Sequence, residues 1–402
     1  MKKIRYAVIG GGINGLAVAR QLLLDNPDAA VTLFEKEAAV AQHQSRHNSG
    51  VVHAGLYYEP GGLKATLCRR GVALMEAYCL QNELPYDKCG KVVVALEKEE
   101  LPRLDAIHKK AVANGVQDVR LISAPELREI EPNCVGLRAL HSPHTAIVSY
   151  GEIAQHIAKD IIEKGASICL NAPVRRLQEL HSEVFVELEN GEIHPHGFDH
   201  AVACAGLQSD RLAYNSGDLE TPKIVPFFGQ YYVIDEAYKS HVKGLIYPVP
   251  DPRFPFLGVH FTKRIDGQMT IGPNAFISLG RENYSGERFS LRDIADYLSY
   301  PGFWKFASRN VPAALRELKT VASSSTFVLE AAKYVPSLAN VGVTPAARGI
   351  RAQAMEHNGS LVDDFVIRRK GRITHIRNAP SPGATSSFAI AEYIVRNLEG
   401  QF

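Results

Sequence analysis

The chain has 402 residues, of which 46% are hydrophobic and 22% charged, and its formal net charge is +2. This is the composition of a globular protein of two or three domains with a substantial core. The near-neutral charge, without a lysine-rich block or an aromatic-basic stripe, excludes a dedicated nucleic-acid surface. No apolar run approaches the ~20 residues that a transmembrane helix needs.

The six cysteines form no C-x-x-C pair and show no metal-ligand spacing. Reduced thiols of this kind are typical of a cytosolic protein, and the N-terminus has the pattern of a first strand rather than of a targeting signal. We therefore expect no metal site and a cytoplasmic location. Peripheral association with the inner face of the membrane stays open, because it needs only a modest surface.

The first predicted elements form a dinucleotide cradle. A largely apolar strand over residues 4–9 runs into Gly10-Gly11-Gly12-Ile13-Asn14-Gly15, a G-x-G-x-x-G pattern. Gly10 makes the tight turn, Gly12 lets the backbone approach a pyrophosphate, and Gly15 allows close helix–strand packing. The helix predicted over residues 15–24 directs its N-terminal N–H groups at the phosphates.

A second strand, predicted over residues 30–34, ends at Glu35, 20 positions beyond Gly15. A carboxylate at this place suits a ribose diol and disfavours a 2′-phosphate. Because strand, helix, second strand and Glu35 agree in register, we predict dinucleotide binding, with Lys36 beside the nucleotide.

Residues 47–58 (HNSGVVHAGLYY) follow the cradle and combine histidines, small residues and tyrosines. Small residues let the backbone lie against a flat cofactor, and a histidine can accept a proton there. The mixture is poor core material and indicates a redox site.

Helices and strands then alternate. We expect helices over residues 63–81, 101–114, 124–131 and 151–164, and strands over residues 91–96, 167–170, 183–188 and 200–206. A hairpin is predicted around Asn190-Gly191, a dipeptide that favours tight turns. The strand over residues 200–206 is apolar and ends in glycine, so Ala205 and Gly206 are predicted to contact the nucleotide.

Residues 220–275 alternate and carry proline-rich turns, as an antiparallel sheet does, and residues 291–318 favour helix. We predict an α/β protein (α+β overall) with a discontinuous Rossmann-like FAD-binding domain and a second domain with a mixed or antiparallel sheet for the substrate. The FAD-binding domain is predicted over residues 1–85, 145–210 and 345–402, and the substrate domain over residues 86–144 and 211–344.

Two charged or titratable residues of the second half stand among apolar neighbours. His260 lies in a strand predicted over residues 257–262, where a core histidine and a site histidine are equally good interpretations. Arg351 needs an anion if it is buried, because an unpaired buried charge is costly. That anion is either Asp363 or Asp364, or a substrate carboxylate, which the guanidinium fork suits and which we favour.

Residues 378–387 (NAPSPGATSS) precede a helix predicted over residues 388–398. Prolines fix the loop, small residues permit close approach, and the helix N-terminus stabilises negative charge such as that of a reduced flavin. A simple turn before a helix is the alternative interpretation. Because cofactor-like motifs return at residues 201–206 and again here, we favour an extended FAD over a nicotinamide cofactor.

Several of these segments together resemble the L-2-hydroxyglutarate dehydrogenase/oxidase family. They are the cradle with Glu35 and residues 47–58, 246–252 (IYPVPDP), 256–260 (FLGVH), 349–353 (GIRAQ) and 378–382 (NAPSP). The family belongs to the FAD-dependent D-amino-acid-oxidase-like superfamily, which also holds glycine oxidase and flavin-linked glycerol-3-phosphate dehydrogenase. Arg46 and Gly383 depart from the family pattern, and Arg46 adds a cation near the predicted site.

The resemblance implies oxidation of L-2-hydroxyglutarate to 2-oxoglutarate, with hydride transfer to flavin N5. A positioned base must take the hydroxyl proton, and histidine suits this role at neutral pH. His53 is the first candidate and His260 the second, while His47 holds the loop or the flavin. Arg351 is predicted to grip the C1 carboxylate in a bidentate manner.

The remaining predicted contacts form two sets. The substrate set is Tyr57, Lys64, Tyr247 and Gln353. The cofactor set is Gly10, Gly12, Gly15, Glu35, Lys36, His47, Asn48, Ser49, Val174, Ala205, Gly206, Pro382, Gly383, Ala384 and Thr385. The expected partners are a small dicarboxylate and either oxygen or a quinone as electron acceptor. A glycerol-3-phosphate dehydrogenase, an amino-acid or amine oxidase, and a flavin-binding module without turnover stay open as alternatives.

Overall fold

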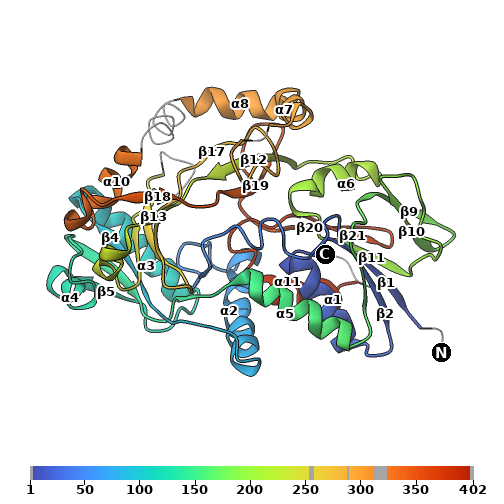
Figure 1. Ribbon diagram of the computed structural model, residues 1–402, viewed down its shortest axis with the longest axis horizontal. Coiled ribbons are helices and arrows are strands. Elements are labelled where there is room, and N and C mark those ends of the chain that lie inside the picture. Colours follow the sequence, from blue (N-terminus) through green and yellow to red (C-terminus); the bar gives the residue numbers. More distant parts are fainter. Residues whose placement is uncertain (1–2, 253–257, 288, 312–323, 399–402) are drawn as a thin grey trace.

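The computed structural model describes residues 3–252, 258–287, 289–311 and 324–398. Its largest sheets lie at opposite ends of the molecule, and a smaller sheet lies between them (Figure 1). None of the helices in these ranges is long and apolar enough to cross a membrane. Phe256 and Leu257 of the family-like segments, and residues 312–318 of the predicted helix, fall outside the described residues.

A six-stranded sheet carries the cradle. Its strands, in spatial order, are β20 (Val366–Lys370), β21 (Ile373–Asn378), β11 (His200–Ala203), β1 (Arg5–Ile9), β2 (Ala30–Phe34) and β8 (Ser167–Cys169). All neighbours pair in parallel except β20, which is antiparallel to β21. In such a sheet, ligands bind at the carboxyl ends of the strands, which is where the glycine-rich turn follows β1.

Three helices cover one face of this sheet: α1 (Ile13–Asp25), α5 (Tyr150–Glu163) and α11 (Ser387–Arg396) (Figure 1). Helices from the first and last parts of the chain therefore pack together, because α1 contacts α11 as well as α5. The contact is dry, since Leu16, Ile157 and Ile390 have no exposed surface. α2 (Leu63–Gln81), which has the predicted bounds, packs on α11.

Two hairpin turns lie beside this sheet, and one of them was predicted. β10 (Glu183–Leu188) pairs with β9 (Val174–Leu180), and the turn lies at His181 and Ser182, whose φ angles are 49° and 66°. The predicted turn at Asn190-Gly191 is also present: Gly191 has a φ of 88°, the Leu188 N–H donates to the Glu192 carbonyl at 2.8 Å, and Glu187 forms an antiparallel bridge with Ile193. The β9–β10 hairpin was not predicted, because β9 is mostly polar and exposed and so lacks the apolar alternation of a strand, and because two non-glycine residues adopt the left-handed conformation at its turn.

An eight-stranded sheet forms the other end of the molecule. Its strands, in spatial order, are β18 (Val343–Pro345), β13 (Tyr232–Ile234), β16 (Met269–Gly272), β15 (His260–Lys263), β14 (Leu245–Pro248), β4 (Lys91–Ala95), β6 (Arg138–Ser142) and β5 (Arg120–Ser123). It is antiparallel except where β14 runs parallel to β4.

Both faces of β4 are covered, which explains its run of three valines. Val92 and Val94 belong to the core that contains Phe327 of α10 (Ser324–Ala332), whereas Val93 packs in the core that contains Leu104 of α3 (Leu101–Ala113). Successive side chains of a strand point to opposite faces, so both sets are buried. A strand buried in this way is a rigid support for any residue at its ends.

The sheet between these two is three-stranded, in the order β17 (Phe276–Ile277), β12 (Lys223–Gly229) and β19 (Gly349–Met355). β12 and β19 pair along seven positions each, from Lys223 opposite Met355 to Gly229 opposite Gly349. This sheet therefore joins segments assigned to different domains in our sequence analysis, and that division stays a prediction.

The remaining elements are short. They are β3 (Val51–Val52), β7 (Ala146–Ile147), α4 (Ala124–Ile130), α6 (Ser209–Asn215), α7 (Leu291–Leu298) and α8 (Pro301–Arg309). The helix predicted from residue 291 is broken between α7 and α8, because a residue before proline disfavours helical geometry and Tyr300 precedes Pro301.

Candidate active site

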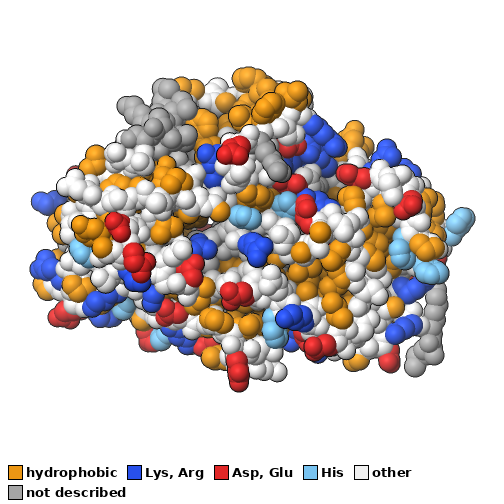
Figure 2. Space-filling model, in the orientation of Figure 1, with side chains coloured by type: hydrophobic (Ala, Val, Ile, Leu, Met, Phe, Trp, Pro, Cys, Tyr) orange, Lys and Arg blue, Asp and Glu red, His pale blue; other side chains and the backbone are white. Residues whose placement is uncertain are grey.

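A cavity of about 1440 Å³ runs from the cradle to the underside of β12 and β19. Ordinary ligand pockets have roughly 300–1,000 Å³, so this cavity has room for a dinucleotide and a small substrate together. In Figure 2, basic and histidine side chains gather near the centre of the visible face. Every predicted site residue lines the cavity except Gly15, which packs behind it.

The three glycines of the cradle lack a side chain for different physical reasons. Gly10 has a φ of +106°, and a Cβ there would lie 2.4 Å from the Cys204 carbonyl oxygen. A Cβ on Gly15 would lie 1.9 Å from the Gly10 carbonyl oxygen, so helix and turn touch here. A Cβ on Gly12 would approach only Ser45 Oγ, at 3.3 Å. Gly12 is therefore not required by the protein's own packing, and it leaves open space where a pyrophosphate would lie.

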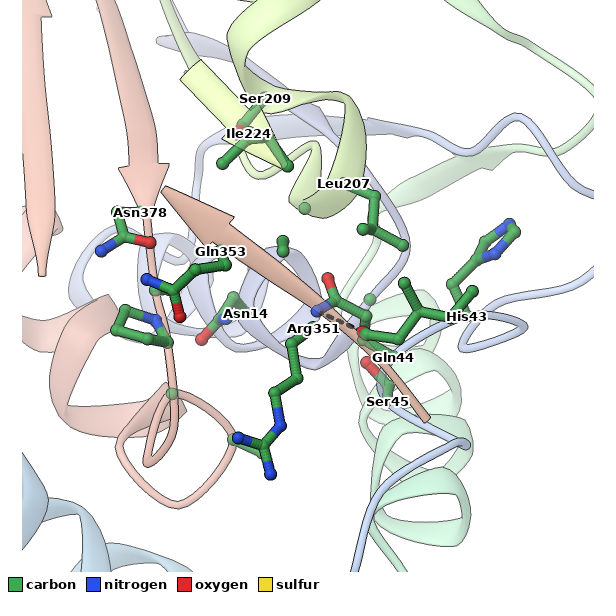
Figure 3. Close-up of a pocket in the computed structure, with 18 of the residues that line it drawn as sticks. Asn14, His43, Gln44, Ser45, Leu207, Ser209, Ile224, Arg351, Gln353 and Asn378 are labelled. Atoms are coloured by element: carbon green, nitrogen blue, oxygen red, sulfur yellow. Dashed lines mark hydrogen bonds between the residues drawn. The ribbon is translucent and has the colours of Figure 1, made fainter. Parts of the chain in front are cut away.

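Polar groups beside the cradle fit a dinucleotide. The Glu35 carboxylate accepts N–H bonds from Gly11 (2.6 Å) and Glu37 (2.9 Å), one at each oxygen, and each oxygen keeps a lone pair for a ribose hydroxyl. Asn14 Oδ1 is buried without a hydrogen-bond partner among the described residues and belongs to a side chain that lines the cavity (Figure 3). A buried acceptor of this kind needs a donor, which a bound dinucleotide supplies.

Lys36 lies at the rim of the cradle among Glu37, His43 and Glu282. Its ammonium bonds to Glu37, lies 2.7 Å from His43 Nε2, and lies 3.0 Å from the Glu282 carboxylate. Burial opposes this charge, but the two carboxylates outweigh it and raise the pKa of Lys36. Lys36 thereby ties the end of β2 to a segment more than 240 positions away.

His53 is held by the loop over residues 378–387, more than 320 positions away. Its backbone N–H donates to Thr385 Oγ1 at 3.1 Å, and its Nε2 lies 3.2 Å from Ser381 Oγ. Thr385 Oγ1 also lies 2.8 Å from the Tyr150 hydroxyl of α5. A Cβ on Gly71 of α2 would lie 2.5 Å from the Thr385 carbonyl oxygen, so α2 packs directly against the backbone of this loop. These contacts place the imidazole at the cavity with little freedom.

Both candidate bases are neutral at neutral pH. Burial and the positive charges of Lys91, Lys64 and Arg351 lower the pKa of His53 to about 3. Burial also lowers the pKa of His260 to about 3, although a bond to a backbone carbonyl partly opposes it. A neutral imidazole has a lone pair that can accept a proton.

The orientation of His260 follows from its neighbours. Its Nδ1 lies 2.9 Å from the Gly258 carbonyl oxygen, so Nδ1 carries the hydrogen and Nε2 carries the lone pair. The ring stacks on Tyr247, with centroids 3.8 Å apart, and the residue is only 4% exposed. His260 is therefore both a packed core histidine and a cavity-lining one, and the two interpretations of the sequence do not exclude each other.

Arg351 lies on β19 and extends its guanidinium into the cavity, beside Gln353 of the same strand (Figure 3). The two aspartates considered as its internal partners are engaged elsewhere. Lys64 Nζ donates to the Asp363 carbonyl and carboxylate oxygens, at 2.7 Å each, and the Lys64 backbone N–H donates to Asp364 Oδ1 at 2.9 Å. Lys64 thus lines the cavity with its charge already paired.

Arg46 lies near the cavity but not in its lining, and its charge contributes, after burial, to the lowered pKa of His47. Arg46 is exposed and bonds weakly to Gln42 at 3.5 Å. The chain turns at this point, because the backbone N–H groups of Arg46 and His47 both donate to the His43 carbonyl. The turn directs His47 into the cavity and Arg46 away from it.

Sequence analysis missed four cavity or near-cavity residues: Lys91, Tyr150, Tyr231 and Ser381. The tyrosines carry no local signal, and Ser381 was treated only as part of a loop. Lys91 did carry a signal, since a lysine directly before a run of buried valines has no solvent to face.

The sequence matches the family described as FAD dependent oxidoreductase over residues 5–397. It is 42% identical over 409 residues to a Caenorhabditis elegans protein, "L-2-hydroxyglutarate dehydrogenase, mitochondrial", covering 100% of this chain and 94% of the relative. The Homo sapiens protein of that name is 41% identical over 411 residues, covering 98% of this chain and 88% of the relative. "L-2-hydroxyglutarate dehydrogenase" of Indibacter alkaliphilus is 39% identical over 384 residues, covering 95% and 96%.

Solved structures share the fold. "Dithionite reduced L-alpha-Glycerophosphate Oxidase from Mycoplasma pneumoniae with FAD bound" has a TM-score of 0.78 at 21% identity, covering 100% of this chain and 97% of that chain. Glycine oxidase from Geobacillus kaustophilus has a TM-score of 0.72 at 16% identity, covering 99% and 95%. The predicted fold class, FAD as cofactor and the family resemblance are thus confirmed. The chain belongs to the FAD-dependent oxidoreductase family and, within it, to the family of the L-2-hydroxyglutarate dehydrogenases.

Proposed function

We propose that this protein oxidises L-2-hydroxyglutarate to 2-oxoglutarate. The observation that carries the proposal is the substrate end of the cavity, where two neutral histidines, His53 and His260, lie among the cations Arg351 and Lys91. A neutral base suits an alcohol, and the positive surroundings suit an anionic substrate. The full-length similarity to dehydrogenases of that name supports the same substrate.

When bound, FAD supplies the two-electron acceptor for the hydride that leaves C2 of the substrate. The cradle residues Gly12, Asn14 and Glu35 would hold its pyrophosphate and ribose side, and the loop over residues 378–387 would lie at its reactive end. Closing the cavity around these groups excludes water from the reacting carbon.

The protein's own chemical step is removal of the hydroxyl proton. An alkoxide is too basic to form beforehand, so the base must take the proton as the C–H bond breaks. We assign this role to His53 first, because Thr385 fixes the backbone that carries the ring and the Ser381 hydroxyl contacts the ring itself. His260 Nε2 is the second candidate.

Substrate charge would strengthen this base. In the protein without substrate, burial and three cations lower the pKa of His53 to about 3. Carboxylates bound beside those cations compensate their charge, and an adjacent negative charge raises the pKa of an imidazole. The histidine therefore becomes a better proton acceptor when a dianion occupies the cavity than when a neutral alcohol does.

Arg351 is proposed to grip the C1 carboxylate, because a bidentate guanidinium–carboxylate pair fixes the orientation of the adjacent C2. Oxygen or a quinone is proposed as the final electron acceptor. A cytoplasmic location is proposed as well, and peripheral association with the inner face of the membrane stays open.

The test is anaerobic mixing of the purified FAD-loaded protein with L-2-hydroxyglutarate, followed by the flavin absorbance at about 450 nm. Bleaching by the L form and not by the D form supports the proposal. Bleaching by glycerol-3-phosphate, or by glycine or another amine, in place of L-2-hydroxyglutarate would contradict it. Reoxidation of the bleached protein by oxygen or by a soluble quinone then identifies the acceptor.

A further inference from the structure

A buried lysine lies behind the substrate end of the cavity. Lys91 opens β4, opposite Leu245 of β14 and Ser142 of β6, and it is 3% exposed. By strand alternation it shares the face of Val93, on which Tyr57 and Tyr247 also pack. Its Nζ lies 3.6 Å from the centre of the Tyr247 ring and 4.8 Å from that of Tyr57.

This ammonium lacks an anion. Within the described ranges, no carboxylate lies at ion-pair distance from Lys91 Nζ, whereas Lys263 on β15 of the same sheet pairs with Asp87 at 2.8 Å. Two aromatic faces attract a cation but do not compensate for its loss of water. Burial accordingly lowers the pKa of Lys91 to about 7. A carboxylate that binds beside this lysine would raise its pKa again and keep it charged, so the place fits a negative partner that arrives from outside the protein.

A second unpaired group lies on the same wall. The Tyr57 hydroxyl is buried and has no hydrogen-bond partner among the described residues, although the Tyr57 ring lies against Lys91. Tyr57 and Tyr247 both line the cavity, and the His260 ring stacks on Tyr247. Lys91 itself is not among the lining residues, and its ammonium lies directly behind these two rings. The ammonium and the Tyr57 O–H, which has no acceptor among the described residues, together form the donor set of a carboxylate site.

The wall is also close to the reacting groups. The centre of the Tyr247 ring is 3.6 Å from Lys91 Nζ and 3.8 Å from the centre of the His260 ring, and His53 lines the same cavity. A carboxylate bound beside Lys91 would therefore leave the other end of the same molecule near the two histidines.

We propose that Lys91 and the Tyr57 hydroxyl hold the ω-carboxylate of the substrate, while Arg351 holds the C1 carboxylate. The inference rests on the proposed function and adds to it the residues that select a dicarboxylate over a 2-hydroxy acid with an uncharged tail. A monocarboxylate would leave both Lys91 and Tyr57 unsatisfied, and a buried unsatisfied group costs the full free energy of its desolvation.

The experiment compares L-2-hydroxyglutarate with its ω-amide, L-2-hydroxyglutaramic acid, which has the same shape and no charge at the tail. Anaerobic stopped-flow reduction of the FAD-loaded protein gives the reduction rate constant and the apparent Kd for each. The preference is the reduction rate constant divided by the apparent Kd, compared between the two substrates. A charge-assisted contact predicts that the unchanged protein prefers the dicarboxylate by about 10- to 100-fold on this measure. Failure of the unchanged protein to be reduced by L-2-hydroxyglutarate would overturn the proposed function itself.

The variant Lys91→Met should reduce that preference to within about 3-fold, because methionine has a similar volume and no charge. Lys91→Arg should restore most of it, whereas Lys263→Met, a matched lysine on the same sheet, should leave it unchanged. A preference retained in Lys91→Met would overturn the inference. A structural role for Lys91 would slow both substrates equally and leave the ratio intact.

Tyr57→Phe tests the proposed carboxylate site independently if Lys91→Met does not fold with FAD. It removes one oxygen atom and should lower the preference by about 3- to 10-fold, the scale of a single hydrogen bond to a charged group. An unchanged ratio in Tyr57→Phe would then count against the site.

Discussion

Replacing His53 by alanine should slow flavin reduction without removing the cofactor. The backbone at this position is held from both sides, since the His53 N–H donates to Thr385 Oγ1 and its carbonyl accepts from Cys68 Sγ at 3.1 Å. Neither bond involves the imidazole. The side chain's own contact, with Ser381 Oγ at 3.2 Å, is a single hydrogen bond that a water molecule can replace.

The expected loss is about 100-fold in the reduction rate constant, which corresponds to roughly 2.7 kcal/mol of barrier and is the lower end of the range for a general base. Substrate affinity should change little, because Arg351 and Lys91 are untouched. The acid side of the pH profile follows from the pKa of about 3 in the free protein: the imidazole must be unprotonated, so the acid-side decline of reduction at limiting substrate should appear as the pH falls towards that value.

The assay is single-turnover anaerobic reduction at about 450 nm, with bound FAD quantified after denaturation. His144→Ala is a suitable control, because His144 lies on the surface beside Asp118. Reduction within about 3-fold of the unchanged rate would refute His53 as the base. The same measurement on His260→Ala would then decide between the second histidine and a mechanism without a histidine base.

Arg351→Lys should raise the apparent Kd for substrate about 10-fold or more in titrations while FAD content stays unchanged, because lysine loses the bidentate fork; an unchanged Kd would contradict the carboxylate role. Gly15→Ala should yield protein without FAD in absorbance spectra, since its Cβ would lie 1.9 Å from the Gly10 carbonyl oxygen. Arg281→Met should lower the free energy of unfolding by about 3–5 kcal/mol in denaturant titrations, because Arg281 pairs with three aspartates at 2% exposure; a loss below about 1 kcal/mol would count against this. Because burial lowers the pKa of His260 to about 3 in the folded protein, from an ordinary value of 6.5, the unfolded chain binds more protons below pH 6.5. The Tm should therefore fall as the pH drops from 6.5 towards 3, and the Tm of His260→Gln should fall less steeply.

The parts of the fold that follow from nearby residues were predictable. The cradle needs a strand, a glycine turn and a helix in direct succession, and α1, β2 and α2 lie where their residue patterns place them. The break before Pro301 and the turn at His181 were not predicted, since one depends on a single residue and the other on conformations that tertiary packing imposes on ordinary residues.

The site, like the fold, has parts that the sequence predicts and parts that it does not. His53 was identified from the small residues around it, but the Ser381 hydroxyl and the Thr385 anchor come from a loop more than 320 positions away. No local pattern shows that the loop over residues 378–387 lies beside His53, because its position depends on the pairing of β21 with β11 and on the packing of α11 against α1.

Residue types and short spacings were enough to establish the chemistry available to this protein: a dinucleotide cradle, histidines beside small residues, and an arginine among apolar neighbours. These are local properties of the chain, so they can be read without knowing how it folds. Charge states and partners instead depend on burial and on distances between remote segments, and they became clear from the folded chain alone. Folding pairs Lys64 with Asp363, turns Arg46 outwards, makes both histidines neutral, and leaves Lys91 buried beside two tyrosines without an anion among the described residues.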